Sequence, residues 1–248
     1  MFLLATEYKR ETLRFPVYVQ PKLNGLRAQK ATDYYSRDRN LWEKNMTEHL
    51  AELPLNYIYD GEFYHHGWSL QRINSAMSIN RLMPNEETKE IEYLVFDLVI
   101  PAMRQKDRLT LLSDLVSPNR CVPTHIVSTQ QEADYYYDFY ISQGYEGLIY
   151  RFPSAMYTHG RSKYLQKRKD FKDEECIVVG ITPGEGKYIG LVGALICQRE
   201  DGKTFKVGTG MDDADRERFQ KEPPIGQRVK IQYIALSDDG LPLNASLL

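Results

Sequence analysis

The chain has 248 residues, with 32 Lys and Arg against 34 Asp and Glu, a formal net charge of −2, and 42% hydrophobic and 12% aromatic residues. Disordered chains lack this apolar content, so we exclude wholesale disorder and expect one large or two small domains. Its apolar start, Met1 to Ala5, is too short for a signal peptide or membrane span, which predicts a cytoplasmic protein without a membrane partner. Three cysteines without a CxxC pair support neither a disulfide framework nor a zinc site.

Short β-rich runs dominate the first part of the chain. Strands are expected at 17–23, 56–64, 91–100 and 146–152, where apolar residues alternate or run continuously. Helices are expected at 41–53, where apolar residues recur at helical spacing, and at 130–143. Such an irregular succession of helices and strands predicts an α+β fold.

The pattern changes after Phe171, where runs of branched residues are separated by turn signals. Strands are expected at 175–182, 193–199, 204–208 and 228–236, and Asp201-Gly202 is a strong hairpin signal between two of them. A five-stranded, partly open barrel such as the oligonucleotide-binding (OB) fold fits this spacing. We therefore predict a domain boundary near Asp170.

The most informative segment is a strand that ends in Lys22, followed by an Asn24-Gly25 turn and Arg27. A turn of this kind presents the lysine where backbone can approach a phosphate closely. On its own, the segment is more often a hairpin with two surface charges. Its chemical interpretation depends on the charged residues that follow in the chain.

Further charged and aromatic residues recur at the ends of predicted strands. Asp60 and Glu62 are two residues apart, so both carboxylates lie on one face and suit a divalent metal or a ribose hydroxyl. Lys167 and Lys169 share a face in the same way, within a cationic strip from Arg161 to Lys172. Such a strip is suited to phosphate, and binding through it should weaken steeply with salt.

The order and spacing of these segments resemble the covalent nucleotidyltransferase superfamily, which comprises ATP-dependent DNA ligases, RNA ligases and mRNA capping enzymes. The matching segments are Lys22 to Arg27 (KxDGxR), Ser36-Arg37 (the short arginine motif), Asp60 to Glu62 (DGE), Leu94 to Asp97 (the aromatic motif), Glu146 to Arg151 (EGxxxR) and Lys167 to Lys169 (KxK). Residues 186–210 are similar to the barrel domain of minimal viral and bacterial DNA ligases. The resemblance implies a nucleotidyltransferase (ATP-grasp-like adenylation) domain at 1–170 and a small OB-fold β-barrel at 171–248.

This resemblance implies an ATP-dependent DNA ligase that seals 5′-phosphate/3′-hydroxyl nicks through a lysyl-AMP and a DNA-adenylate, with Lys22 as the nucleophile. The residues that it implies for ATP and AMP are Gln20, Lys22, Arg27, Glu62, Phe96, Glu146, Lys167 and Lys169. Arg37 would hold the 5′-phosphate of the nick, and Lys203 and Lys206 would contact DNA. Asp60 and Glu146 would bind Mg²⁺, for which Mn²⁺ is an alternative. The expected partner is nicked duplex DNA, and the expected state is a monomer.

Several alternatives stay open within and outside this superfamily. An RNA ligase or a capping-type guanylyltransferase shares the lysine motif, whereas an NAD⁺-dependent ligase is disfavoured because three scattered cysteines cannot form its zinc module. Asn24 replaces the usual Asp of the lysine motif, and no Lys or Arg follows Lys230. The resemblance places a basic motif in that last region, so slow self-adenylylation, or a non-catalytic nick-binding module, is also an expectation.

Overall fold

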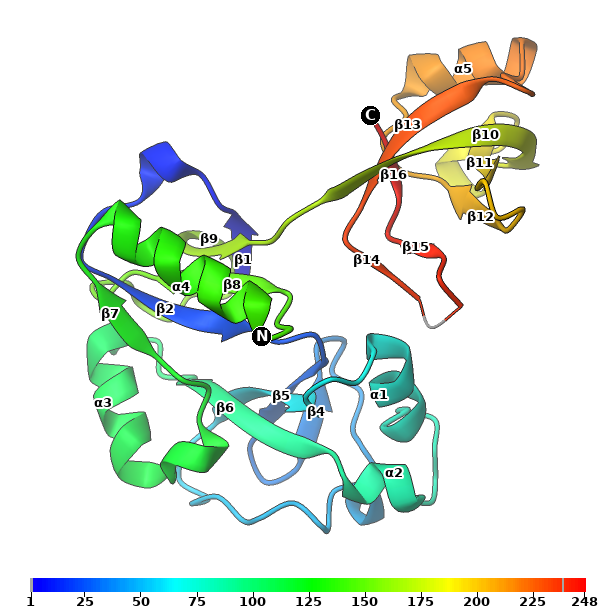
Figure 1. The fold of residues 1–248 in the computed structure, drawn as a ribbon. Helices are drawn as coiled ribbons and strands as arrows, with labels where there is room; N and C mark the ends of the chain where they lie inside the picture. The colour runs from blue at the N-terminus through cyan, green and yellow to red at the C-terminus, as the bar shows by residue number, and fades with distance from the viewer. Residues whose placement is uncertain (1, 238) are drawn as a thin grey trace. The chain divides into compact units, whose positions relative to one another are not determined.

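The structure is a computed structural model that describes residues 2–237 and 239–248. The chain divides into two units between Lys169 and Asp170, and each is described by itself (Figure 1). None of the helices in the described residues is long and apolar enough to cross a membrane.

The first unit is built on two sheets. One has the strand order β1-β9-β8-β2-β7 and the other β4-β3-β5-β6. Their strands are β1 Leu3–Glu7, β2 Val17–Lys22, β3 Leu26–Lys30, β4 Tyr34–Ser36, β5 Tyr59–Tyr64, β6 Glu92–Leu98, β7 His125–Val127, β8 Gly147–Arg151 and β9 Gly160–Arg168. The helices are α1 Leu70–Ala76, α2 Glu86–Lys89, α3 Gln105–Leu115 and α4 Gln130–Ser142. This arrangement confirms the α+β prediction.

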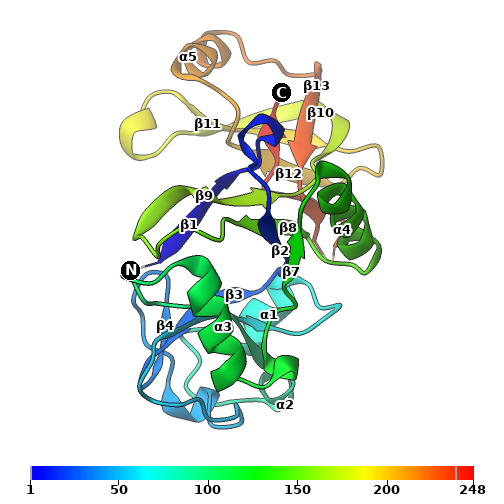
Figure 2. The same cartoon turned by 90° about the vertical axis from the view of Figure 1, so that its left-hand side faces the viewer.

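Helix α4 covers one face of the first sheet and so leaves the other face for a site. Val19 on β2 and Leu148 on β8 are fully buried in one cluster with Ala133 and Tyr137 of α4. The helix begins where the Thr129 side chain accepts a hydrogen bond from the Glu132 N–H, which satisfies one of its free amide groups. Figures 1 and 2 both show α4 alongside β8 and β2.

The helix predicted at 41–53 is wrong. Only a short 3₁₀ turn, Lys44–Met46, forms there, although Trp42 and Met46 are buried. The Trp42 ring N–H donates to the Met77 carbonyl at 2.8 Å and Asn45 donates to the Leu82 carbonyl at 2.6 Å. These side chains anchor the segment to residues more than thirty positions away. The Trp42 backbone N–H donates to the Tyr34 carbonyl at 3.1 Å instead of to a helical partner, so the apolar spacing reflects an irregular buried segment.

The second unit is a five-stranded sheet of order β12-β11-β10-β13-β16 with one helix and a small hairpin. Its elements are β10 Lys172–Pro183, β11 Val192–Gln198, β12 Thr204–Val207, α5 Asp213–Lys221, β13 Arg228–Tyr233, β14 Ala235–Leu236, β15 Pro242–Leu243 and β16 Ser246–Leu247. The hairpin predicted at Asp201-Gly202 joins β11 and β12, and Gly202 has the positive φ of 82° that such a turn requires. The edge strands β12 and β16 do not pair with each other, although Thr209 and Ser246 form an isolated bridge. The unit is thus the partly open OB-like sheet that the sequence predicts.

Candidate active site

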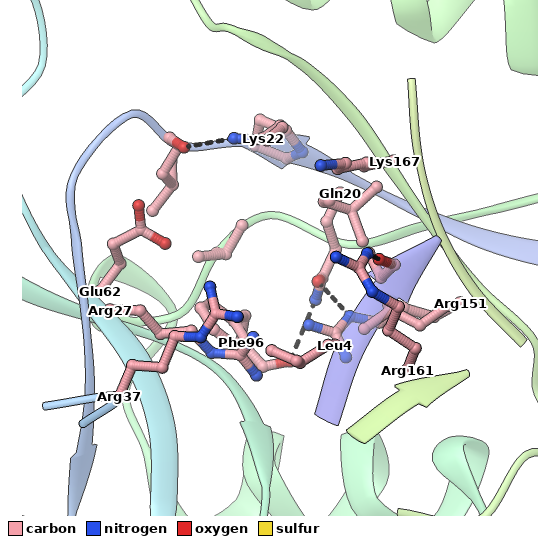
Figure 3. Close-up of a pocket in the computed structure, with 16 residues that line it drawn as sticks. Leu4, Gln20, Lys22, Arg27, Arg37, Glu62, Phe96, Arg151, Arg161 and Lys167 are labelled. Atoms are coloured by element: carbon pink, nitrogen blue, oxygen red, sulfur yellow. Dashed lines mark hydrogen bonds between the residues drawn. The ribbon is translucent and has the colours of Figure 1, made fainter. Parts of the chain in front are cut away.

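A cavity of about 280 Å³ lies in the first unit, lined by residues from both of its sheets. Its walls carry six cationic side chains, Lys22, Arg27, Arg37, Arg151, Arg161 and Lys167, and a single carboxylate, Glu62. Figure 3 shows Glu62, Arg27 and Arg37 on one side of this pocket and Arg151 and Arg161 on the other. A partly enclosed pocket with this excess of positive charge attracts phosphate groups.

Lys22 ends β2 at the rim of the pocket, with its side chain 21% exposed. Its ammonium group contacts the Glu146 carboxylate, whose other oxygen lies 3.8 Å from the Lys169 ammonium group. Burial lowers the pKa of Lys169. The structure thus brings together Lys22, Glu146 and Lys169, three of the residues predicted for nucleotide transfer.

Two glycines allow the strands to approach closely around Lys22. A Cβ on Gly25 would lie 2.2 Å from the Phe63 carbonyl oxygen, and one on Gly147, at φ 156°, would lie 2.0 Å from the Arg168 carbonyl oxygen. Both distances are far below a van der Waals contact, so a side chain at either position would force the strands apart. Gly25 therefore lets the turn after Lys22 approach the strand that carries Glu62, and Gly147 lets β8 approach the strand that carries Lys167.

Phe96 forms part of the pocket wall with its side chain nearly buried. The guanidinium carbons of Arg27 and Arg151 lie 5.3 and 5.0 Å from its ring centroid, within cation–π range. The Gln20 amide group is held in place because its nitrogen donates to the Phe96 carbonyl at 3.2 Å and its oxygen accepts from Arg151 at 2.6 Å. The Gln20 nitrogen also donates to the Thr124 hydroxyl at 2.8 Å. Gln20 would therefore have to exchange one of these bonds to contact the edge of a base.

The structure does not favour Asp60 as a metal ligand. Its two oxygens accept from the Arg27 guanidinium at 3.0 and 2.7 Å, and one also accepts from the Tyr157 hydroxyl at 2.6 Å. Asp60 is fully buried and is not part of the pocket wall. Its carboxylate holds Arg27 against the pocket, so of the two predicted metal ligands only Glu146 lies beside Lys22.

Glu62 faces the pocket and accepts a hydrogen bond from the Gly25 N–H at 2.8 Å. Burial raises the pKa of Glu62 from 4.5 to about 7, although Lys22 and the Gly25 N–H oppose the shift. The folded protein therefore takes up a proton at Glu62 well above the pH at which the unfolded chain does.

We expect wild-type protein to lose stability relative to a Glu62→Gln variant as the pH rises from about 4.5 to 7. A folded-state pKa above the unfolded value stabilises the fold fully below the unfolded pKa, and this contribution is lost as the pH rises through the folded pKa. The difference should be at most about 3 kcal/mol, from 1.36 kcal/mol per pKa unit. Thermal unfolding of both proteins at pH 5 and pH 8 measures it, and a constant difference between them would contradict the assignment.

The remaining predicted residues have different surroundings. Lys167 faces the pocket and pairs with Glu7 at 3.0 Å, while Arg37 is exposed at its rim. Lys203 and Lys206 belong to the second unit, where Lys203 donates to the Asp239 carbonyl at 2.6 Å.

Two arginines of the pocket wall, Arg151 and Arg161, were not predicted as site residues. Arg151 is buried, and its guanidinium group lies 3.0 Å from Asp97, whereas Arg161 is exposed and donates to the Ala5 carbonyl at 3.2 Å. The sequence did contain a pattern for each of them: Arg151 is the arginine of the EGxxxR motif, and Arg161 is the first residue of the cationic strip from Arg161 to Lys172. Neither pattern shows that the side chain lines this pocket.

Residues 4–169 match the model of the ATP dependent DNA ligase domain, and residues 183–248 match that of the DNA ligase OB-like domain. The chain belongs to the ATP-dependent DNA ligase family. A DNA ligase of African swine fever virus (isolate Kenya) is 29% identical over 92% of this chain and 61% of its own length. A DNA ligase of Haemophilus influenzae is 35% identical over 39% of this chain and 35% of its own. The chain thus spans less than two thirds of either relative.

Solved structures of the family are also similar to this chain. A Lig E DNA ligase superimposes with a TM-score of 0.88 at 27% identity, covering 100% of this chain and 97% of the other. The Chlorella virus DNA ligase-adenylate superimposes with a TM-score of 0.57 at 26% identity, covering 100% and 96% of the two chains. The similarity therefore includes both units.

Proposed function

We propose that this chain is an ATP-dependent DNA ligase that seals nicks between a 5′-phosphate and a 3′-hydroxyl in duplex DNA through a lysyl-AMP. The observation that carries the proposal is the position of Lys22, at the rim of a cationic pocket and in contact with Glu146. Membership of the ATP-dependent DNA ligase family supports it, as does the similar Chlorella virus ligase, whose solved form is an adenylate.

Lys22 supplies the nucleophile in this proposal. Attack on the α-phosphate of ATP needs a neutral amine, so the ion pair between Lys22 and Glu146 must open and the Lys22 ammonium group must pass its proton to water, which its 21% exposed side chain can reach. The N–P bond of the lysyl-AMP then forms as the bond between the α- and β-phosphates breaks, and pyrophosphate leaves. Lys167 and Lys169 then lie beside the reacting phosphate and counter its charge. AMP passes next to the 5′-phosphate of the nick, held by Arg37, and the 3′-hydroxyl finally displaces AMP to form the phosphodiester.

Glu146 is the carboxylate that would hold Mg²⁺. Among the described residues no group of three or more His, Cys, Asp or Glu side chains could hold a metal, but Mg²⁺ typically uses one or two carboxylates together with substrate phosphates. A bound Mg²⁺ would neutralise charge on the transferring phosphoryl group. Engaging Glu146 in this way would also release Lys22 from its ion pair.

Incubation of the purified protein with ATP and Mg²⁺, followed by mass spectrometry, tests the proposal. We expect AMP on Lys22 and sealing of a nicked DNA duplex. An adduct of GMP in preference to AMP would indicate a capping enzyme, and sealing only of RNA strands would indicate an RNA ligase. Binding of nicked DNA without any adduct would show a non-catalytic module.

A further inference from the structure

A second and larger cavity, of about 650 Å³, lies at the β1 edge of the first sheet. The strands β1 and β9 form a wall that it shares with the 280 Å³ pocket beside Lys22, the proposed nucleotide pocket. Ala5 and Lys167 line the nucleotide pocket, whereas their neighbours Thr6 and Gln166 line the second cavity. Successive residues of a strand point to opposite faces, so the two cavities lie on opposite faces of this sheet. Because β1 is the edge strand, a chain-like ligand can reach both cavities by passing around this edge.

The second cavity carries uncompensated positive charge. Lys9, Arg14 and Lys163 line it and are exposed, and no carboxylate in the described residues forms an ion pair with any of them. Arg14 donates to the backbone carbonyls of Glu11 and Leu13 at 2.9 and 2.7 Å, which orients its guanidinium group without neutralising it. The one acidic residue of the lining, Glu7, pairs with Lys167 at 3.0 Å.

A buried glutamine joins the backbone segments that carry two of these cations. Gln166 is 2% exposed. Its amide group donates to the Lys163 carbonyl at 3.0 Å and to the Thr12 hydroxyl at 2.9 Å, and its oxygen accepts from the Lys9 N–H at 3.3 Å. Two segments far apart in the sequence are thus joined so that Lys9 and Lys163 present their charges in one cavity. The 48% exposed ring of Tyr164 completes its wall.

We propose that the second cavity binds backbone phosphates of the DNA strand that crosses the β1 edge from the nucleotide pocket. This inference rests on the proposed function and adds a second place at which the protein binds its DNA substrate. Phosphates suit the site because exposed Lys and Arg side chains without carboxylate partners are available to form charge-assisted hydrogen bonds with phosphate oxygens. A free nucleotide offers the same phosphate chemistry, but the wall shared with the nucleotide pocket favours a ligand that reaches both cavities.

The test compares Lys9→Ala/Arg14→Ala/Lys163→Ala with a control, Lys44→Ala/Arg81→Ala/Lys89→Ala, which removes the same charge from outside both cavities. Affinity for a nicked duplex is measured from 50 to 200 mM salt, without ATP. Each neutralised phosphate contributes about −0.9 to the slope of log affinity against log salt. The slope of the cavity variant should therefore be less steep than that of the wild type by about 2 to 3, and the variant should bind the duplex about tenfold or more weakly at 50 mM salt. The control should lose less than about 1.

Self-adenylylation with ATP is measured on the same three proteins. It should be unchanged, which also shows that the first unit of each variant is folded. If the wild type forms no adduct, the proposed function fails; if adducts form but the cavity variant keeps the wild-type slope, the cavity proposal fails alone. If calorimetry shows that the cavity variant binds one ATP fewer than the wild type while its salt slope is unchanged, the cavity binds a free nucleotide and the proposal is wrong.

If the triple variant does not fold, the single variants Lys9→Ala and Lys163→Ala replace it. Each is expected to reduce the steepness of the salt slope by about 0.9, and an unchanged slope in both would reject the proposal.

Discussion

Lys22→Ala is expected to form no AMP adduct with ATP and Mg²⁺, a loss of at least about 10⁴-fold in self-adenylylation, because removal of a covalent nucleophile removes the reaction path itself. The ammonium group of Lys22 stands at the pocket rim beside Glu146 and near Lys169. Lys169 lies on the far side of the same carboxylate, so it is the lysine that could replace Lys22 with the least rearrangement. The prediction is that it does not.

The measurement is mass spectrometry of the intact protein after incubation with labelled ATP. Lys22→Arg is the matched control, since it keeps the positive charge and the ion pair with Glu146 but offers no amine nucleophile. Both variants should still bind nicked DNA and should close a nick that already carries 5′-AMP, at a reduced but measurable rate. An adduct on another residue, or sealing of ordinary nicks from ATP by Lys22→Ala, would show that the nucleophile is misassigned.

The sequence predicted the site where local patterns define it. Lys22 ends β2, Glu62 is a charged residue within β5, and Phe96 is an aromatic residue within β6. All three line the same pocket. The turn after Lys22 and the glycine after Glu146 could also be predicted from the sequence. Backbone atoms approach Gly25 and Gly147 so closely that no other side chain fits at either position.

The part that sequence reasoning missed depends on distant neighbours. Asp60 has the spacing of a metal ligand, but Tyr157, 97 residues further on, and Arg27 occupy both of its oxygens. Gln20 was predicted to read a base, yet its amide group is engaged by the Phe96 carbonyl and by Arg151. Tertiary packing determines which hydrogen-bond partner a buried polar group meets, and local sequence patterns do not predict that partner.

Asp97→Ala is expected to destabilise the first unit by about 3 to 5 kcal/mol, because it removes the one carboxylate shared by two buried arginines. Asp97 and Arg108 are fully buried. The Asp97 oxygens accept from Arg108 at 2.8 and 3.0 Å, from Arg151 at 3.0 Å and from the Gln105 amide at 3.2 Å. Removing the carboxylate leaves two guanidinium groups in the interior without a counter-charge.

The measurement is the shift of the thermal unfolding transition, compared with Glu86→Ala. Glu86 pairs with Lys89 at 2.8 Å, but both side chains are more than half exposed, and such a surface pair contributes about 1 kcal/mol or less. Asp97→Asn should fall between the two, since an amide keeps an acceptor but not the charge. Equal shifts for Asp97→Ala and Glu86→Ala would contradict the prediction.

The same substitution should also impair nucleotide binding, because Asp97 orients Arg151, whose guanidinium group holds Gln20 and lies beside the ring of Phe96. The KM for ATP should rise more than the rate of adenylylation falls, since Lys22 and Glu146 take no part in this network. A fall in rate without a change in KM would place the role of Asp97 at the reacting phosphate instead of at the base.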